Sequence, residues 1–195
     1  MDMKYSDEEI RGYFMKLDRS RFIDEQKTLA ALDRPLPIGH GQTISQPSLV
    51  LSMTLKLELD SDDKVLEIGT GSGFQTALLS RFSRSVYTVE RIRALHESSK
   101  QRLMDLGYKN IYFHYGDGHE GWKKHAPYDK IMVTAAAEEI PENLINQLAP
   151  GGKMVIPVGG LPGQELKLVE KDKEGNMRDS TFEHVMFVKF KKDTD

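Results

Sequence analysis

From residue 64 onward, short apolar runs alternate with helical patterns, and no other feature of the sequence constrains the fold as strongly. The expected strands are residues 65–68, 85–89, 111–115, 130–133 and 153–158, and the expected helices are residues 74–82, 92–106 and 141–148. Strands joined by helices form parallel sheets, because each helix returns the chain to the same end of the sheet. Two further strand-like segments, 165–169 and 182–190, have no helix between them and predict an antiparallel hairpin. The fold class is therefore α/β, with a doubly wound, mostly parallel sheet that ends in this hairpin.

The first 60 residues lack this alternation and predict an N-terminal helical extension. Residues 6–17 carry a capping signature, with Glu9 three residues after Ser6, and place apolar residues on one helical face. A loop rich in proline and glycine spans residues 34–46, and Pro47 opens a second helical pattern. We expect residues 1–195 to form a single domain. Its parts are the helices and covering loop (1–60), the βα core (61–160) and the C-terminal hairpin (161–195).

Composition excludes several classes of protein. Lys and Arg number 27 against 30 Asp and Glu, a near-neutral balance that argues against a nucleic-acid partner. The chain has no cysteine, which excludes disulfides and thiol nucleophiles, and its histidines lack a metal-ligand spacing, so we expect no metal site. Residues 35–55 are uncharged, but prolines and glycines interrupt them, so we expect no membrane span. The acidic N-terminus shows no apolar signal stretch, which predicts a cytoplasmic chain.

A glycine cluster follows the first expected strand and has the pattern E-x-G-x-G-x-G. Glycines at alternate positions let the backbone turn tightly and let a ligand approach closely. In open α/β sheets, ligands bind outside the carboxyl end of such a strand. The dinucleotide fingerprint G-x-G-x-x-G would require glycine where Phe74 stands, which weakens the hypothesis of an NAD(P) oxidoreductase. The candidate ligand-binding residues in this loop are Glu67, Gly69, Gly71, Ser72 and Gly73.

An acidic residue, Glu90, ends the next expected strand. A carboxylate at this point can accept hydrogen bonds from both hydroxyls of a ribose. Together, the loop and this acid resemble motif I and the ribose-binding acid of the class I S-adenosylmethionine-dependent methyltransferases. The resemblance implies a Rossmann-like fold, S-adenosylmethionine as the methyl donor and S-adenosylhomocysteine as the product.

Two longer motifs narrow this resemblance. Residues 116–131 begin G-D-G-H-E-G-W and resemble the signature of the protein-L-isoaspartate O-methyltransferases. Residues 35–47 read P-L-P-I-G-H-G-Q-T-I-S-Q-P and resemble the loop that precedes motif I in the same family. The resemblance covers about residues 34–170. It implies methylation of the free α-carboxylate of L-isoaspartyl residues, or the side-chain carboxylate of D-aspartyl residues, in damaged proteins and peptides, followed by non-enzymatic return of the ester to succinimide.

The resemblance also implies roles for individual residues. Ser45 matches the family's catalytic serine, although its place before Pro47 equally suits a helix N-cap. The residues implied beside the cofactor are Thr43 and Ile44, at the junction with the substrate, and Asp117 and Gly118, at the adenine. The reacting carboxylate has a reference pKa near 4 and is ionised at pH 7, so the reaction needs alignment rather than a general base. A hydroxyl such as that of Ser45 positions a carboxylate more mildly than Arg or Lys would.

Two positions depart from the family's pattern. Glu138 stands where proline is common, and Lys189 stands in a final segment that usually reads V-x-F-V-P-L. Both departures are expected beside the substrate. The alternative hypotheses are a class I methyltransferase that acts on RNA or a small molecule, and a non-catalytic protein-binding domain that keeps the cofactor fold. The first predicts a motif such as N-P-P-Y after the fourth strand, where V-T-A-A-A stands, and the second predicts loss of the glycine loop, Glu90 or Ser45.

Overall fold

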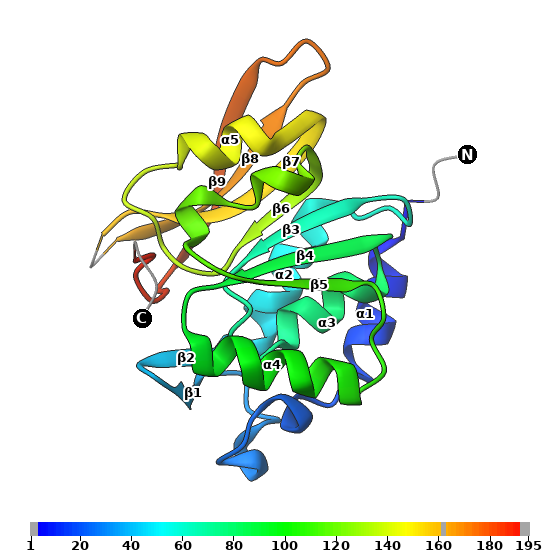
Figure 1. The fold of residues 1–195 in the computed structure, drawn as a ribbon, viewed down its shortest axis with the longest axis vertical. Coiled ribbons are helices and arrows are strands. Elements are labelled where there is room, and N and C mark those ends of the chain that lie inside the picture. The colour runs from blue at the N-terminus through cyan, green and yellow to red at the C-terminus, as the bar shows by residue number, and fades with distance from the viewer. Residues whose placement is uncertain (1–3, 161–162, 192–195) are drawn as a thin grey trace.

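Seven strands form one twisted sheet in the order β5-β4-β3-β6-β7-β8-β9 (Figure 1). The computed structural model describes residues 4–160 and 163–191. The strands of the large sheet are β3 (Lys64–Ile68), β4 (Ser85–Glu90), β5 (Ile111–Tyr115), β6 (Tyr128–Val133), β7 (Leu148–Val158), β8 (Gln164–Lys171) and β9 (Met177–Val185). The pairs from β5 to β7 are parallel, whereas β8 runs antiparallel to both β7 and β9. The predicted mostly parallel α/β sheet with a C-terminal antiparallel hairpin is confirmed.

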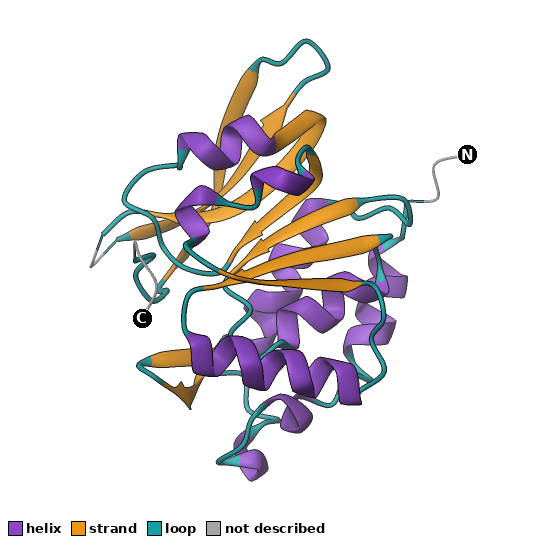
Figure 2. Cartoon of the chain, in the orientation of Figure 1, coloured by secondary structure: helices purple, strands orange, loops and turns teal. Residues whose placement is uncertain are grey.

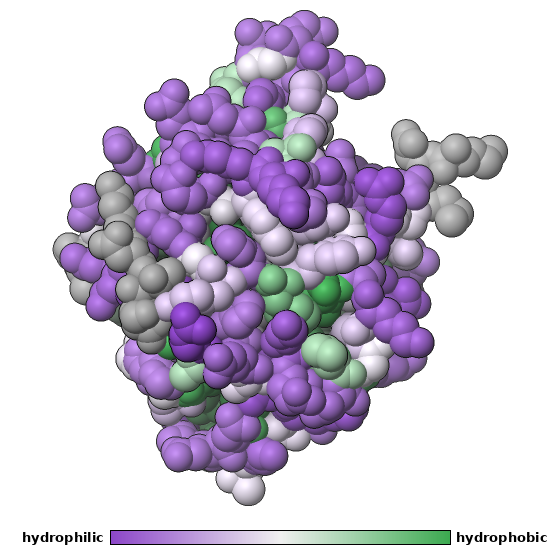
Figure 3. Space-filling view, viewed as in Figure 1, coloured by the Kyte–Doolittle hydropathy of each residue, from purple (hydrophilic) through white to green (hydrophobic). Residues whose placement is uncertain are grey.

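Helices cover both faces of this sheet (Figure 2). The α-helices are α1 (Asp7–Phe14), α2 (Pro47–Leu57), α3 (Phe74–Arg81), α4 (Arg93–Asp105) and α5 (Glu142–Gln147). Single 3₁₀ turns are η1 (Arg19–Phe22), η2 (Lys27–Leu29), η3 (Gly118–Glu120) and η4 (Lys123–His125). No helix in the described part of the chain is long and apolar enough to cross a bilayer. The face of the molecule seen in Figure 3 is mostly hydrophilic.

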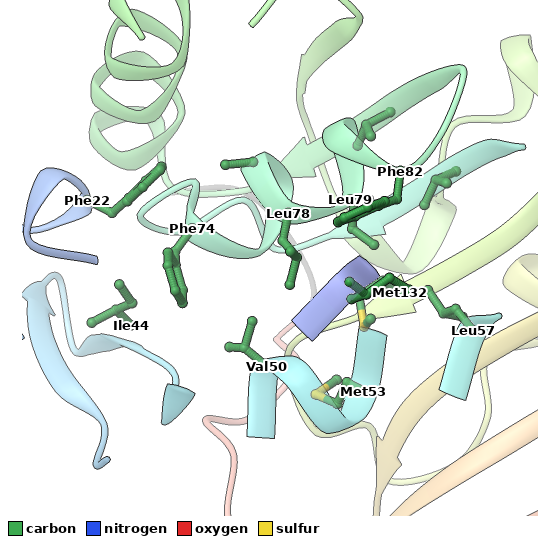
Figure 4. Packing of buried hydrophobic residues seen from close by; sticks show 14 of the residues in the cluster. Phe22, Ile44, Val50, Met53, Leu57, Phe74, Leu78, Leu79, Phe82 and Met132 are labelled. Carbon is green, nitrogen blue, oxygen red and sulfur yellow. The ribbon is translucent and has the colours of Figure 1, made fainter. Parts of the chain in front are cut away.

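Alternating strand residues supply two apolar cores, because successive side chains of a strand point to opposite faces. On one face, Val65 and Met132 pack with the apolar sides of α1, α2 and α3. Figure 4 shows Met132 among the labelled apolar residues of α2 and α3. On the other face, Leu66 and Ile131 pack with α5 and with Tyr128. Both faces of β3 and β6 are therefore buried, as expected for central parallel strands, and the carboxyl ends of these strands are held at one edge.

The ends of α1 and α2 agree only in part with the signals in the sequence. The capping box of α1 is present, with the Ser6 side chain accepting from the backbone of Glu9, although the helix ends at Phe14 and not at residue 17. Gln46, not Ser45, is the N-cap residue of α2. The Ser45 hydroxyl therefore has no capping role, and the N-cap interpretation of Ser45 is wrong.

Two segments differ from the sequence-based expectation. The segment expected to be a loop, 34–46, contains a small hairpin, β1 (Leu36–Gly39) and β2 (Gln42–Ile44). Its two turn residues, His40 and Gly41, have φ values of +54° and +68°, as two-residue hairpin turns require. The final strand was expected over 182–190 but ends at Val185, and the chain then leaves β8 and pairs elsewhere.

Candidate active site

An open cavity of about 930 Å³, which includes the solvent at its mouth, lies at the carboxyl ends of β3, β4 and β6. We call it the first cavity. Among the residues singled out from the sequence, it is lined by Thr43, Ile44, Ser45, Gly69, Gly71, Ser72, Glu90 and Gly118. Glu67, Gly73 and Asp117 are not among its lining residues. The fold thus brings the N-terminal loop, the glycine loop and the end of β4 to one place.

The glycine loop follows a path that only glycine can take. Gly69 has a φ of +93°, and a Cβ at this position would overlap Thr134 Oγ1. Thr134 Oγ1 lies 2.9 Å from the carbonyl oxygens of both Ile68 and Gly69, to which its hydroxyl donates. Thr134 also lines the first cavity, and sequence reasoning gave it no role. Its position directly after β6 was the signal that could have identified it.

Glu90 is fixed at the end of β4 and faces the first cavity. One carboxylate oxygen accepts from the Gly71 N–H and the other from the Ile92 N–H, each at 2.9 Å. Burial raises the pKa of Glu90, and the backbone N–H groups that favour the ionised form oppose this rise. Two carboxylate oxygens offer about four lone-pair sites, so acceptor capacity remains for a ligand in the cavity.

Glu67 lies beneath the glycine loop. One of its oxygens accepts from Thr76 Oγ1 at 2.6 Å and from Thr88 Oγ1 at 2.7 Å, and Thr70 Oγ1 lies 2.6 Å from Thr88 Oγ1. Its other oxygen has no hydrogen-bond partner within the described part of the chain. Complete burial raises the pKa of Glu67 to about 8. The contacts of this carboxyl group are with the hydroxyls that support the loop.

Asp117 lines a separate cavity of about 1440 Å³. We call it the third cavity and keep the name second cavity for the one that meets the first cavity at Ser45. Its carboxylate accepts from the His119 N–H at 2.9 Å, and the His119 ring stacks on Phe190 with centroids 3.8 Å apart. A Cβ at Gly118 would overlap Ile68 and approach Phe190. The loop after β5 is therefore pressed closely against the end of β3 and the C-terminal segment.

Ser45 lies where the first cavity meets a second one of about 1200 Å³. Both cavities are lined by Thr43, Ser45, Thr134 and Val188. A group bound in one cavity can therefore reach a group bound in the other beside the Ser45 side chain. This junction is the feature expected of a site that brings two reactants together.

The backbone of Ser45 is held by Arg19, a residue that the sequence did not single out. The Arg19 side chain is only 5% exposed. Its guanidinium donates to the carbonyl oxygens of Ala30, Leu32, Arg34, Ile44 and Ser45. The partners are scattered along the chain, so no local motif announces this arrangement.

The last wall of the first cavity comes from residues 188–191. The Ala136 N–H donates to the Val188 carbonyl, and the Phe190 N–H donates to the Ala136 carbonyl, each at 2.8 Å. This pairing places Lys189 at the rim of both the first and the third cavities, while Glu138 lines the third cavity alone. The two departures from the family pattern therefore lie close to the candidate site. Within residues 4–160 and 163–191, no three His, Asp or Glu side chains are grouped to hold a metal ion.

Proteins of one family are similar to this chain over most of its length. A family model for protein-L-isoaspartate(D-aspartate) O-methyltransferase matches residues 3–195. The chain belongs to this family. It is 50% identical over 184 residues to protein-L-isoaspartate O-methyltransferase 2 of Syntrophobacter fumaroxidans, which covers 93% of this chain and 74% of that protein. It is 51% identical over 172 residues to the protein-L-isoaspartate O-methyltransferase of Pseudomonas aeruginosa, covering 87% of this chain and 81% of that one.

A solved structure is similar over nearly the whole chain. It is a crystal structure from Plasmodium falciparum, assigned as a protein-L-isoaspartate O-methyltransferase and in complex with S-adenosyl-L-homocysteine. The TM-score is 0.83 at 26% identity, and the match covers 97% of this chain and 93% of that one. The isoaspartate methyltransferase fold therefore extends over the N-terminal helices as well as the βα core.

Proposed function

We propose that this chain repairs damaged proteins by methylating the free α-carboxylate of L-isoaspartyl residues, or the side-chain carboxylate of D-aspartyl residues. The methyl donor is S-adenosylmethionine, and the products are S-adenosylhomocysteine and a methyl ester that re-forms succinimide without the enzyme. Family membership supports this proposal. The observation that carries it is Ser45 at the junction of a cavity bounded by the glycine loop with a second, open cavity.

The residues of the first cavity fit the methyl donor. The Glu90 carboxylate retains acceptor capacity for ribose hydroxyls, and Gly69 and Gly71 leave the loop backbone open to close approach. Ile68 and Phe190 add apolar surface beside Gly118, which suits the adenine end. When bound, S-adenosylmethionine supplies a methyl group attached to a sulfonium sulfur. After transfer of the methyl group, the rest of the molecule leaves as a neutral thioether.

The chain's own task is then to hold the acceptor carboxylate in line. The carboxylate is already ionised at pH 7, so no residue has to remove a proton. We assign the Ser45 hydroxyl to donate to this carboxylate, with Thr43 and Thr134 beside it at the junction. A neutral donor orients the carboxylate while leaving it nucleophilic. The Arg19 guanidinium keeps Ser45 in place by binding its carbonyl oxygen at 3.0 Å.

The three parts of the chain all contribute to this site, so we also propose that residues 1–195 work as one methyltransferase domain. The cavity takes Ser45 from the first part, the glycine loop and Glu90 from the second, and Val188 from the third. The cytoplasmic location and the absence of nucleic-acid and membrane partners stay predictions from the sequence.

The test is methyl transfer from radiolabelled S-adenosylmethionine to two peptides that differ only in an L-isoaspartyl or L-aspartyl linkage. We expect base-labile label on the isoaspartyl peptide alone. Ser45→Ala should lower kcat about 100-fold, as loss of a single positioning donor typically does, with little change in the affinity for S-adenosylhomocysteine. Ser48→Ala is the matched control, because Ser48 lies in the same region but lines neither cavity. Cofactor binding without transfer to the isoaspartyl peptide would favour an RNA or small-molecule acceptor instead.

A further inference from the structure

Gln164, the first residue of β8, has a buried side-chain amide that forms two hydrogen bonds with one backbone unit. The side chain is only 2% exposed. Its Nε2 donates to the Phe187 carbonyl at 3.1 Å, and its Oε1 accepts from the Phe187 N–H. An amide side chain has both a donor and an acceptor. It can therefore hydrogen bond to the N–H and the carbonyl of one residue, as the backbone of a neighbouring strand would.

This pair continues the sheet beyond the end of β9. Within the ladder, Gln164 stands opposite Val185, the last residue of β9. Phe187 lies two residues beyond Val185, past the end of the β8–β9 ladder, so the ladder pairs it with no residue of β8. From there the chain runs to Val188 and Phe190, which hydrogen bond to Ala136. The segment 187–190 therefore has two anchors, Gln164 at its start and Ala136 farther along.

The residues held by the two anchors line different sets of cavities. Phe187 lines the second cavity and Val188 lines the first and the second, while Lys189 and Phe190 line the first and the third. The Ala136 anchor holds Val188, which faces the first and second cavities, and Phe190, which faces the first and third. The Gln164 anchor holds the part that faces the second cavity, on which Ser45 also opens.

We propose that Gln164, which itself lines the second cavity, is a positioning residue for the peptide substrate that acts by fixing Phe187 in the wall of that cavity. This inference rests on the proposed function, because it takes the second cavity as the place of the peptide. Without the amide, the Phe187 N–H and carbonyl lose their buried partners, and the wall is in place in only a fraction of the molecules. The apparent affinity for a ligand of that wall falls by the same fraction.

The experiment compares Gln164→Leu with Gln147→Leu. Loss of two partly buried hydrogen bonds predicts that Gln164→Leu raises the KM for an isoaspartyl peptide about ten-fold. The Kd for S-adenosylhomocysteine and kcat at saturating peptide should change far less, because the Ala136 anchor remains. Gln147 is 3% exposed, and its amide bonds to the backbone of Trp122, Glu120 and Asn143. It lines neither the first nor the second cavity, so its variant should lose stability without a change in KM.

Gln164→Glu supplies a rescue that a merely structural role would not show. A protonated carboxyl group can donate to the Phe187 carbonyl and accept from its N–H, whereas an ionised carboxylate can only accept. Burial shifts the pKa of such a carboxyl upward, toward the range of the assay. The ratio of its KM to that of the wild type should therefore fall as the pH is lowered from about 8 to about 5.5.

The outcomes separate the two proposals. An unchanged peptide KM in Gln164→Leu, an equal rise in Gln147→Leu, or a KM ratio for Gln164→Glu that is flat with pH would each overturn the role of Gln164 and leave the repair activity intact. Failure of the wild type to methylate the isoaspartyl peptide would instead overturn the proposed function, and the role of Gln164 with it.

Discussion

Arg19 offers the sharpest test of how the N-terminal region is held together. Replacing it with Met keeps much of the aliphatic volume and removes the guanidinium that binds five carbonyl oxygens. Burial lowers the pKa of Arg19, and the nearby Asp33 carboxylate raises it, but the group stays charged at pH 7. The variant therefore loses a cation that water cannot easily replace at the buried carbonyls.

The size of the effect follows from which carbonyls are buried. The hydrogen bonds to the Ala30 and Ile44 carbonyls are buried, while those to Leu32, Arg34 and Ser45 are partly exposed and can be replaced by water. An unsatisfied buried carbonyl costs about 1–3 kcal/mol, so two of them give a loss of about 4 kcal/mol in the free energy of unfolding. For a chain of 195 residues this lowers Tm by about 12 °C. Arg19→Lys should lose about half as much, because one ammonium cannot reach all five acceptors.

Urea unfolding, with thermal melting as a second measurement, tests this reasoning. Arg21→Met is the matched control, since Arg21 lies in the same 3₁₀ turn, η1, but is exposed, and its replacement should stay within about 0.5 kcal/mol of the wild type. A loss below about 1 kcal/mol in Arg19→Met, or an equal loss in Arg21→Met, would refute the argument that the buried guanidinium holds this region.

Three further predictions concern the loop and its supports. Glu90→Gln should weaken S-adenosylhomocysteine binding about ten-fold in calorimetric titration, while an unchanged Kd would contradict the ribose assignment. The pKa of Glu67 is raised to about 8 in the folded chain, so its contribution to stability is present below pH 4.5 and lost as the pH rises through 8. Between pH 6 and pH 9, the free energy of unfolding in urea should therefore fall less in Glu67→Gln than in the wild type. Gly69→Ala should cost about 2 kcal/mol through its clash with Thr134, whereas Gly12→Ala, in the open on α1, should be neutral or stabilising.

The sequence was most informative where a function depends on neighbouring residues. The run from β3 through the glycine loop to α3 is local, and its pattern predicted the order of strand, turn and helix. Glu90 could be placed because it directly ends the next strand, and parallel strands bring their carboxyl ends to one edge.

Sequence reasoning was least informative where long-range contacts decide. Arg19 binds carbonyls from residues 30 to 45, and no local pattern shows this. The segment 182–190 read as one strand because Phe and Val recur through it, but its pairing with β8 ends at Val185, since β8 itself begins at Gln164. Likewise, an acid before a glycine loop suggested a ligand contact at Glu67, and its burial against Thr76 and Thr88 depends on two other elements.

The walls of the first cavity come from segments that are far apart in the sequence, so the cavity is completed late in synthesis of the chain. One wall is formed by residues 42–45 and another by residues 188–191, and a ribosome makes them in that order. A nascent chain that has already produced the glycine loop and Glu90 still lacks the segment that pairs with Ala136. We therefore expect a chain that stops before residue 188 to lack methyl-transfer activity, and a chain that includes residues 188–191 to have it.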